Sequence, residues 1–222
     1  MADYMEAMKA RHAVRSYSDK PIQESAKQAL EAKIEEVNKA GNLHIQLVCD
    51  EPEAFDGFMA RYGKFSGVRN YIAMIGPKGD GLSERLGYYG EELVLLAQSL
   101  GLNTCWVAMT YKKVKSAFEV RPGEKIAVVI SLGYGTTQGV AHTSKAASEV
   151  SNAAPGDPAW FTAGVEAALL APTAMNQQKF RFERDGDKVK ATPGSGFYSK
   201  IDLGIAKLHF ELGAGKENFT WA

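Results

Sequence analysis

Two arginines and a histidine lie close together near the start of the chain, in RHAVRSY, residues 11–17. Arginine presents a planar fork of N–H donors that matches the oxygens of a phosphate, so Arg11 and Arg15 beside His12 could bind an anion. The same residues could instead form a solvated helix end, where cations offset the helix dipole. The spacing alone leaves both interpretations open.

A second candidate is SLGYGTTQGVAHTSK, residues 131–145, which leaves a predicted buried strand through three glycines and then reaches His142 and Lys145. Loops that follow a strand often line binding sites, and glycines allow the backbone to approach a ligand closely. The glycine spacing does not fit the dinucleotide fingerprint G-x-G-x-x-G. The alternative is a flexible connector with a solvated lysine.

A third candidate, LLAPTAMNQQKFRF over residues 169–182, joins a predicted helix to a predicted strand. The side chains of Thr173, Asn176 and Gln177 carry donors and acceptors that could recognise the edge of a flat heterocycle. Threonine and asparagine also stabilise turns by hydrogen bonding to nearby backbone, so a purely structural role is the alternative.

Composition and charge exclude other partners. The 222 residues carry 26 Lys+Arg and 26 Asp+Glu, so the broad positive field of a nucleic-acid-binding protein is missing. The four histidines and two cysteines lack the paired spacing of a metal site, and no apolar run is long enough to span a membrane. Cys49 and Cys105 lie in apolar runs and the N-terminal segment does not look like a secretory signal, so we expect a cytoplasmic protein.

The sequence also lacks a serine nucleophile elbow, a phosphate-binding P-loop and a zinc-protease motif. The pairs Glu35-Glu36 and Glu91-Glu92 are expected on exposed faces of helices, where they solvate the surface rather than act as an acid–base pair.

The hydrophobic period predicts the elements that must position the three candidate segments. We expect helices to be stopped by Gly41, Gly101 and Gly213, and we expect Asp157 to cap a helix that begins at Pro158. The expected helices lie around residues 4–8, 26–37, 93–100, 158–169 and 201–212; the expected strands are residues 44–49, 70–75 and 125–132 and a hairpin turning at Asp185-Gly186.

The two halves of the chain share an order of predicted elements. AGNLHIQLVCD aligns with AMNQQKFRFERD, and LGLNTCW with LGAGKENFTW. We favour a diverged duplication, with a chance likeness of two α+β halves as the alternative. The expected divisions are a first half at 1–135, a connector lining the site at 136–157 and a second half at 158–222.

Four segments together resemble the FMN-dependent nitroreductase family. RHAVRSYSDKPI resembles its arginine-rich opening, GYYGEELVLLAQSLGLNTCWVAM its helix ending in Gly-Leu-Gly-x-Cys-Trp, APTAMNQQKFRF its Pro-Ser-x-x-Asn turn, and SLGYGTTQGVAHTSKAASEV its Leu-Gly-Tyr strand end. The turn comes late in this chain, as in a smaller branch with duplicated halves. The resemblance implies an α+β fold with a mixed, mainly antiparallel sheet flanked by helices.

The resemblance also implies which residues hold FMN. Residues of the arginine-rich segment and of the connector would clamp the phosphate. The Pro-Thr-x-x-Asn turn would approach the flavin from the second half, and the residues after Cys-Trp would follow the isoalloxazine edge. No titratable catalytic residue or metal is required, because the chemistry takes place at flavin N5. The implied residues are Arg11, His12, Arg15, His142 and Lys145; Pro172, Thr173 and Asn176; and Val107, Ala108 and Met109.

We therefore expect an NAD(P)H oxidoreductase that passes a hydride from NADH or NADPH to FMN and then reduces a small aromatic or quinone-like acceptor. Other flavin reactions, such as dehalogenation or azoline oxidation, remain open. So does a flavin-binding or flavin-free regulatory protein, because Ala13 replaces the usual serine and Lys179-Phe180 the usual Pro-Trp. A chain that contains both halves of the site favours a monomer over the homodimer of the family.

Overall fold

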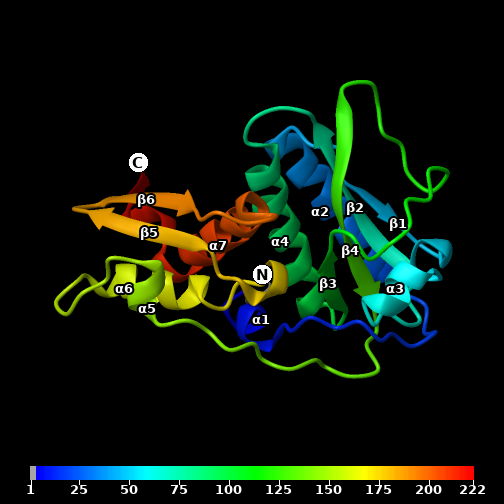
Figure 1. Ribbon diagram of the computed structural model, residues 1–222, viewed down its shortest axis with the longest axis horizontal. Coiled ribbons are helices and arrows are strands. Elements are labelled where there is room, and N and C mark those ends of the chain that lie inside the picture. Colours follow the sequence, from blue (N-terminus) through cyan, green and yellow to red (C-terminus); the bar gives the residue numbers. More distant parts are fainter. Residues whose placement is uncertain (1–3) are drawn as a thin grey trace.

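Two central helices, α4 (Leu82–Ser99) and α7 (Ser199–Ala214), pack against each other and join the two halves of an α+β fold. The computed structural model describes residues 4–222. In Figure 1 the elements of the second half lie on the left of the molecule and the larger sheet lies on the right, with α4 between them. The expected fold class is confirmed.

The first sheet is four-stranded and antiparallel, in the order β1-β2-β4-β3. Alternate residues of its strands enter two cores, as the pleat requires. Met74 and Ile130 face a core shared with α2 and α4, whereas Ala73 and Val129 face a smaller core that includes Phe55. The strands are β1 (Gln46–Val48), β2 (Asn70–Pro77), β3 (Asn103–Val107) and β4 (Glu124–Gly133). Besides α4, the helices of this half are α1 (Tyr4–Ala10), α2 (Glu24–Gly41) and α3 (Phe58–Tyr62).

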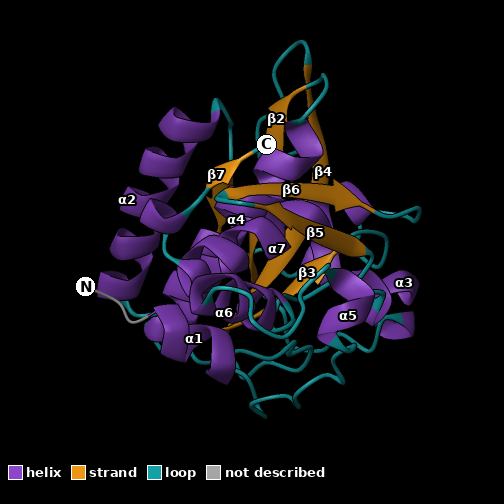
Figure 2. Cartoon of the chain, turned by 90° about the vertical axis from the view of Figure 1, so that its left-hand side faces the viewer, coloured by secondary structure: helices purple, strands orange, loops and turns teal. Residues whose placement is uncertain are grey.

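The second sheet consists of the antiparallel pair β5 (Phe180–Asp185) and β6 (Lys188–Pro193), with β7 (Thr220–Trp221) parallel to β6. Helices α5 (Ala147–Val150), α6 (Ala159–Ala168) and α7 accompany it. Aromatic packing fixes this half, because Phe182 stacks on Phe210 with ring centroids 4.6 Å apart. Figure 2 shows α2 as a long helix along one side of the molecule, opposite α3 and α5.

Local signals for chain reversal were partly correct. Gly101 follows α4 with φ +77°, as predicted, and the hairpin forms with Asp185 paired to Lys188. The helix expected to stop at Gly41 does end there, although Asn42 rather than a glycine takes the left-handed conformation after it.

Two predicted helix signals are wrong. Gly213 lies inside α7, where an added Cβ would be 2.5 Å from the Ala167 Cβ, so this glycine allows α7 to approach α6. Asp157 does not cap α6; its carboxylate accepts hydrogen bonds from the Ala154 N–H and the Arg184 guanidinium.

The order of elements is similar in the two halves: α2-β1-β2-α4-β3 in the first and α6-β5-β6-α7-β7 in the second. Strand β4 has no counterpart in the second half, and β7 therefore pairs directly with β6. The duplication and the domain boundaries stay predictions.

Candidate functional site

The arginine-rich segment is extended rather than helical, and it runs along the edge of β3. The Val14 N–H donates to the Thr104 carbonyl at 3.0 Å, and Ala13 forms a parallel bridge with Thr104. In an extended chain, residues an even number apart share a face. Val14 is buried in the smaller core, whereas Arg11, Ala13 and Arg15, which are an even number of residues apart, line a common hollow to which His12 also contributes.

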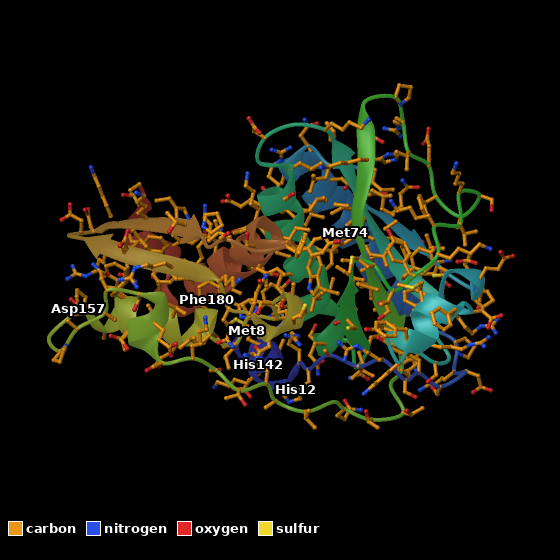
Figure 3. All side chains as sticks on the ribbon, viewed as in Figure 1. Met8, His12, Met74, His142, Asp157 and Phe180 are labelled. Atoms are coloured by element: carbon orange, nitrogen blue, oxygen red, sulfur yellow. The ribbon has the colours of Figure 1, made fainter. Side chains whose placement is uncertain are left out.

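The glycines of the connector allow it to pack on this segment. A Cβ on Gly139, which has φ +73°, would lie 2.8 Å from the His12 Cβ, and one on Gly133 would lie 3.0 Å from the Tyr17 ring. The sequence suggested that these glycines make room for a ligand. In the structure they make room for the chain itself, and this packing brings His142 toward His12 (Figure 3).

We call the resulting depression the anion hollow; its volume is about 330 Å³. Burial, followed by the charges of Arg11 and His142, lowers the pKa of His12, so this ring is neutral at neutral pH. The His142 Nε2 lies 2.9 Å from the Leu169 carbonyl, to which it donates. The anion hollow is lined by Arg11, His12, Ala13, Arg15, Val140, Ala141, His142, Pro172, Thr173, Met175 and Asn176.

Arg11 is the residue of the anion hollow that most needs a ligand. Its side chain is only 6% exposed, and its Nη1 has no hydrogen-bond partner among residues 4–222. A buried guanidinium without an acidic partner is costly, since the desolvation of the charge is not offset. An anion at this position would remove that cost, and the residues present therefore fit the phosphate of FMN.

The turn from Pro172 to Gln178 forms the opposite wall. Met175, Asn176 and Gln178 all have positive φ, between 45° and 53°, which side chains other than glycine rarely adopt. Hydrogen bonds hold this conformation: the Gln178 N–H donates to Thr173 Oγ1 at 3.0 Å, and Asn176 Nδ2 donates to the Thr143 carbonyl at 2.9 Å. The turn is therefore fixed by side chains of its own segment and by the backbone of the connector.

Lys145 lies outside the anion hollow. Its ammonium donates to the Gln178 carbonyl at 3.3 Å, and its backbone N–H donates to Gln178 Oε1 at 2.9 Å. In this structure Lys145 supports the strained turn, and its expected contact with a phosphate stays a prediction.

A second, smaller space of about 130 Å³ adjoins the anion hollow, and we call it the inner cavity. The two share Ala13, Arg15, Pro172, Thr173 and Met175, so one elongated ligand could extend from one into the other. The other residues that line the inner cavity are Cys105, Trp106, Ala108, Val128, Ala174, Tyr198, Ile201, Asp202 and Ile205.

The three residues expected beside the flavin edge differ in position. Ala108 lines the inner cavity. Val107 is 3% exposed in the smaller core, and Met109 is 69% exposed and lines neither space. Of this segment, Cys105, Trp106 and Ala108 line the inner cavity, whereas Val107 does not.

Asp202 is a site residue that the sequence analysis missed. It is 2% exposed at the start of α7 and accepts hydrogen bonds from Gln177 Nε2 at 2.7 Å and from the Ala174 N–H at 3.0 Å. Burial raises its pKa to about 6, although both hydrogen bonds oppose the shift. Ile205 and Ala206, three and four residues later, are apolar, and this helical spacing could have indicated burial.

The prediction that Glu91 lies on an exposed face of a helix is wrong. Its side chain is fully buried; it accepts from Trp106 Nε1 at 2.9 Å and lies 3.0 Å from His209 Nε2. His209 Nδ1 donates to the Ala167 carbonyl, so Glu91 and His209 Nε2 share one proton between them. This buried pair orients the indole that lines the inner cavity.

The described residues contain no cluster of three or more metal-ligating side chains, and none of their helices is both long and apolar enough to cross a membrane.

Comparison with known proteins gives one family. The family model described as "Putative TM nitroreductase" matches residues 3–214, and a search of the curated proteins gives no match. A solved "putative nitroreductase" from Thermotoga maritima is 21% identical, with a TM-score of 0.67, over 97% of this chain and 85% of that one. A "putative nitroreductase in complex with FMN" from Desulfovibrio desulfuricans is 16% identical, with a TM-score of 0.54, over 71% of this chain and 98% of that one.

Proposed function

The chain belongs to this nitroreductase family, and from that membership we propose that it is an FMN-dependent oxidoreductase that uses NADH or NADPH to reduce a small aromatic or quinone-like acceptor. The observation that carries the proposal is Arg11, a buried cation whose Nη1 lacks a partner in the described chain, at the wall of a hollow that continues into an apolar cavity. A phosphate at one end of a flat, largely apolar ligand suits this arrangement.

The residues of the chain would divide the binding of FMN between them. Arg11 would hold the phosphate with Arg15, and the neutral ring of His12 would contribute an N–H donor without adding a full charge, whereas the Nε2–H of His142 is already donated to the Leu169 carbonyl. Pro172 and the strained turn would limit one wall of the ring site, and Trp106 and Ala108 the other. Bound FMN would supply the redox chemistry by accepting a hydride from NAD(P)H and passing electrons to the acceptor.

Asp202 would affect the charge and the width of the inner cavity. A carboxyl with a pKa of about 6 is mostly ionised at neutral pH, so it places a negative charge beside the inner cavity. Its two hydrogen bonds hold the turn against α7, and we infer that this fixes the width of the ring site. Met175, which is 99% exposed at the edge of both spaces, would offer an apolar contact to an entering acceptor.

The visible absorption spectrum of the purified protein tests the proposal. We expect a yellow protein, or a colourless one that takes up FMN, whose flavin bands bleach on anaerobic addition of NADH or NADPH. A protein that binds FMN but is not reduced would support a flavin-binding regulator on the same scaffold. A protein that does not take up FMN at all would contradict the flavoprotein assignment.

A further inference from the structure

A third hollow lies on the other side of the α4–α7 pair. Four of the residues that line it stand at a constant distance in sequence from four residues that line the inner cavity. We call it the far hollow; its volume is about 350 Å³. Helix α7 and the residue before it give the inner cavity Tyr198, Ile201, Asp202 and Ile205. Helix α4 and the residue before it give the far hollow Gly81, Glu84, Arg85 and Tyr88, each 117 residues earlier in the chain.

The same spacing relates the two glycines at the helix crossing. A Cβ on Gly87 would collide with the Ile201 carbonyl, and a Cβ on Gly204 would collide with the Glu84 carbonyl. Each hollow also has a tryptophan wall, Trp106 in one and Trp221 in the other. The two spaces therefore occupy equivalent positions on the two halves of the helix pair, and the far hollow is the counterpart of the inner cavity.

The chemistry of the far hollow is different, because Arg85 stands where the inner cavity has Asp202. The Arg85 guanidinium has no ion-pair or hydrogen-bond partner within residues 4–222, and its Nε is shielded from solvent. The carboxylates nearby are already engaged: Glu84 pairs with Lys207 at 2.7 Å, and Glu211 accepts from Trp221 Nε1 at 2.7 Å. An anionic ligand would meet a cation that the fold leaves unpaired.

The aromatic residues that line the far hollow favour an anionic ligand that also carries a ring. Tyr88, Tyr89 and Trp221 border the far hollow, so a planar apolar group can replace water against aromatic surfaces. The Lys207 ammonium lies 4.6 Å from the centroid of the Trp221 ring and covers the surface on which a flavin-sized ring system would need to stack. With Lys207 on that ring face, a single ring, which needs less of the wall, suits the far hollow better than a tricyclic one.

We propose that the far hollow is a second ligand site, which binds a small aromatic carboxylate through a forked contact with Arg85 and through ring contacts with Tyr88 and Trp221. The site is separate from the anion hollow, so it goes beyond the proposed function and does not depend on it. Arginine matches a carboxylate through two parallel N–H donors, which a single point charge cannot reproduce.

Titration with sodium benzoate, followed by NMR of the indole N–H groups, tests this site. The Trp221 signal is assigned by the loss of one peak in Trp221→Phe. We expect saturable shifts at Trp221 in the protein with and without FMN, and no displacement of FMN. Uncharged benzamide should bind at least about tenfold more weakly, because it cannot form the charge-assisted contact. Arg85→Gln should weaken benzoate by a similar factor, and Arg85→Lys should weaken it less.

Several outcomes would overturn the proposal. They are benzoate affinity unchanged in Arg85→Gln, shifts confined to Trp106, competition between benzoate and FMN, or inorganic phosphate binding as tightly as benzoate. Arg121→Gln, which changes an arginine that does not line the far hollow, is the matched control and should leave the titration unaltered. The benzamide comparison uses the unmodified protein, so it decides the question even where an Arg85 variant folds poorly. A protein without FMN would refute the proposed function and leave this test intact.

Discussion

Trp106 on β3 donates its indole N–H to the carboxylate of Glu91 on α4, at 2.9 Å, and this bond connects the wall of the inner cavity to a fully buried acid. The same carboxylate faces His209 on α7, so one side chain connects three elements from both halves of the chain. A buried group of this kind is costly to leave half-paired, because the remaining donors lose their partner without regaining water.

Glu91→Ala is therefore expected to destabilise the protein by about 3–5 kcal/mol, since it leaves the Trp106 N–H and the His209 ring without an acceptor. Glu91→Gln should cost much less, because its amide can accept from Trp106 and donate to a neutral His209. Urea unfolding followed by circular dichroism measures both. Glu35→Ala, on an exposed part of α2, is the control and should change stability by less than about 0.5 kcal/mol. A loss in Gln as large as that in Ala would mean that the amide does not restore these hydrogen bonds, and small losses in both variants would mean that the bonds contribute little.

The crossing of α4 and α7 should not tolerate a methyl group. Gly87→Ala and Gly204→Ala each place a Cβ against backbone of the opposite helix, which cannot rotate away, and we expect losses of about 3 kcal/mol or more despite the higher helix propensity of alanine. Gly57→Ala is the control, because a Cβ there meets nothing within 4 Å. Thermal unfolding compares the three variants; a stability near that of the wild type for Gly87→Ala would refute the close crossing.

Much of the fold could be predicted from the sequence, because helices and strands follow local periodicity. The burial of Glu91 could not, because its partners Trp106 and His209 lie 15 and 118 residues away. The position of Lys145 depends on a turn whose positive-φ residues are not glycines, so no local rule indicates it. Arg11 and Pro172 line the same hollow although most of the chain separates them in sequence. The resemblance to the family, rather than their spacing, predicted that they meet.

Asp202 should make stability depend on acid pH. Its pKa in the folded chain is about 6, against an ordinary value of 3.8, so between about pH 4 and pH 6 the native state binds more protons than the unfolded state. Stability must therefore fall as pH rises through this window, by up to about 3 kcal/mol from this group, and then level off. Asp202→Asn removes the titration. Unfolding free energies at several pH values, taken as wild type minus variant, should show the slope. A difference that stays flat from pH 4 to pH 7 would disprove the raised pKa.

Removing Arg11 and removing Lys145 should weaken FMN binding to different extents. Arg11→Ala should weaken FMN binding by about tenfold to a hundredfold, because a charge-assisted contact of roughly 1.5–3 kcal/mol is lost. Stability without FMN should not fall, since the buried charge has no partner to lose and its uncompensated desolvation is removed. Lys145→Ala should have a smaller effect on affinity, because its ammonium is bound to the Gln178 carbonyl. Quenching of flavin fluorescence on titration measures both, and unaltered binding in Arg11→Ala would remove that residue from the site.

Assembly and cofactor stoichiometry form the last prediction. The packed α4–α7 pair unites the two halves within one chain, and the counterpart of the inner cavity has Arg85 in place of Asp202 and a lysine over its tryptophan. Nothing like RHAVR precedes the second half, so the far hollow lacks a phosphate clamp. We therefore expect a monomer that binds one FMN per chain. Light scattering gives the mass, and flavin absorbance against protein concentration gives the ratio. A stable dimer would refute the monomer, whereas two FMN per chain would show that the far hollow accepts flavin despite Lys207 and would also overturn its assignment to a single-ring acid.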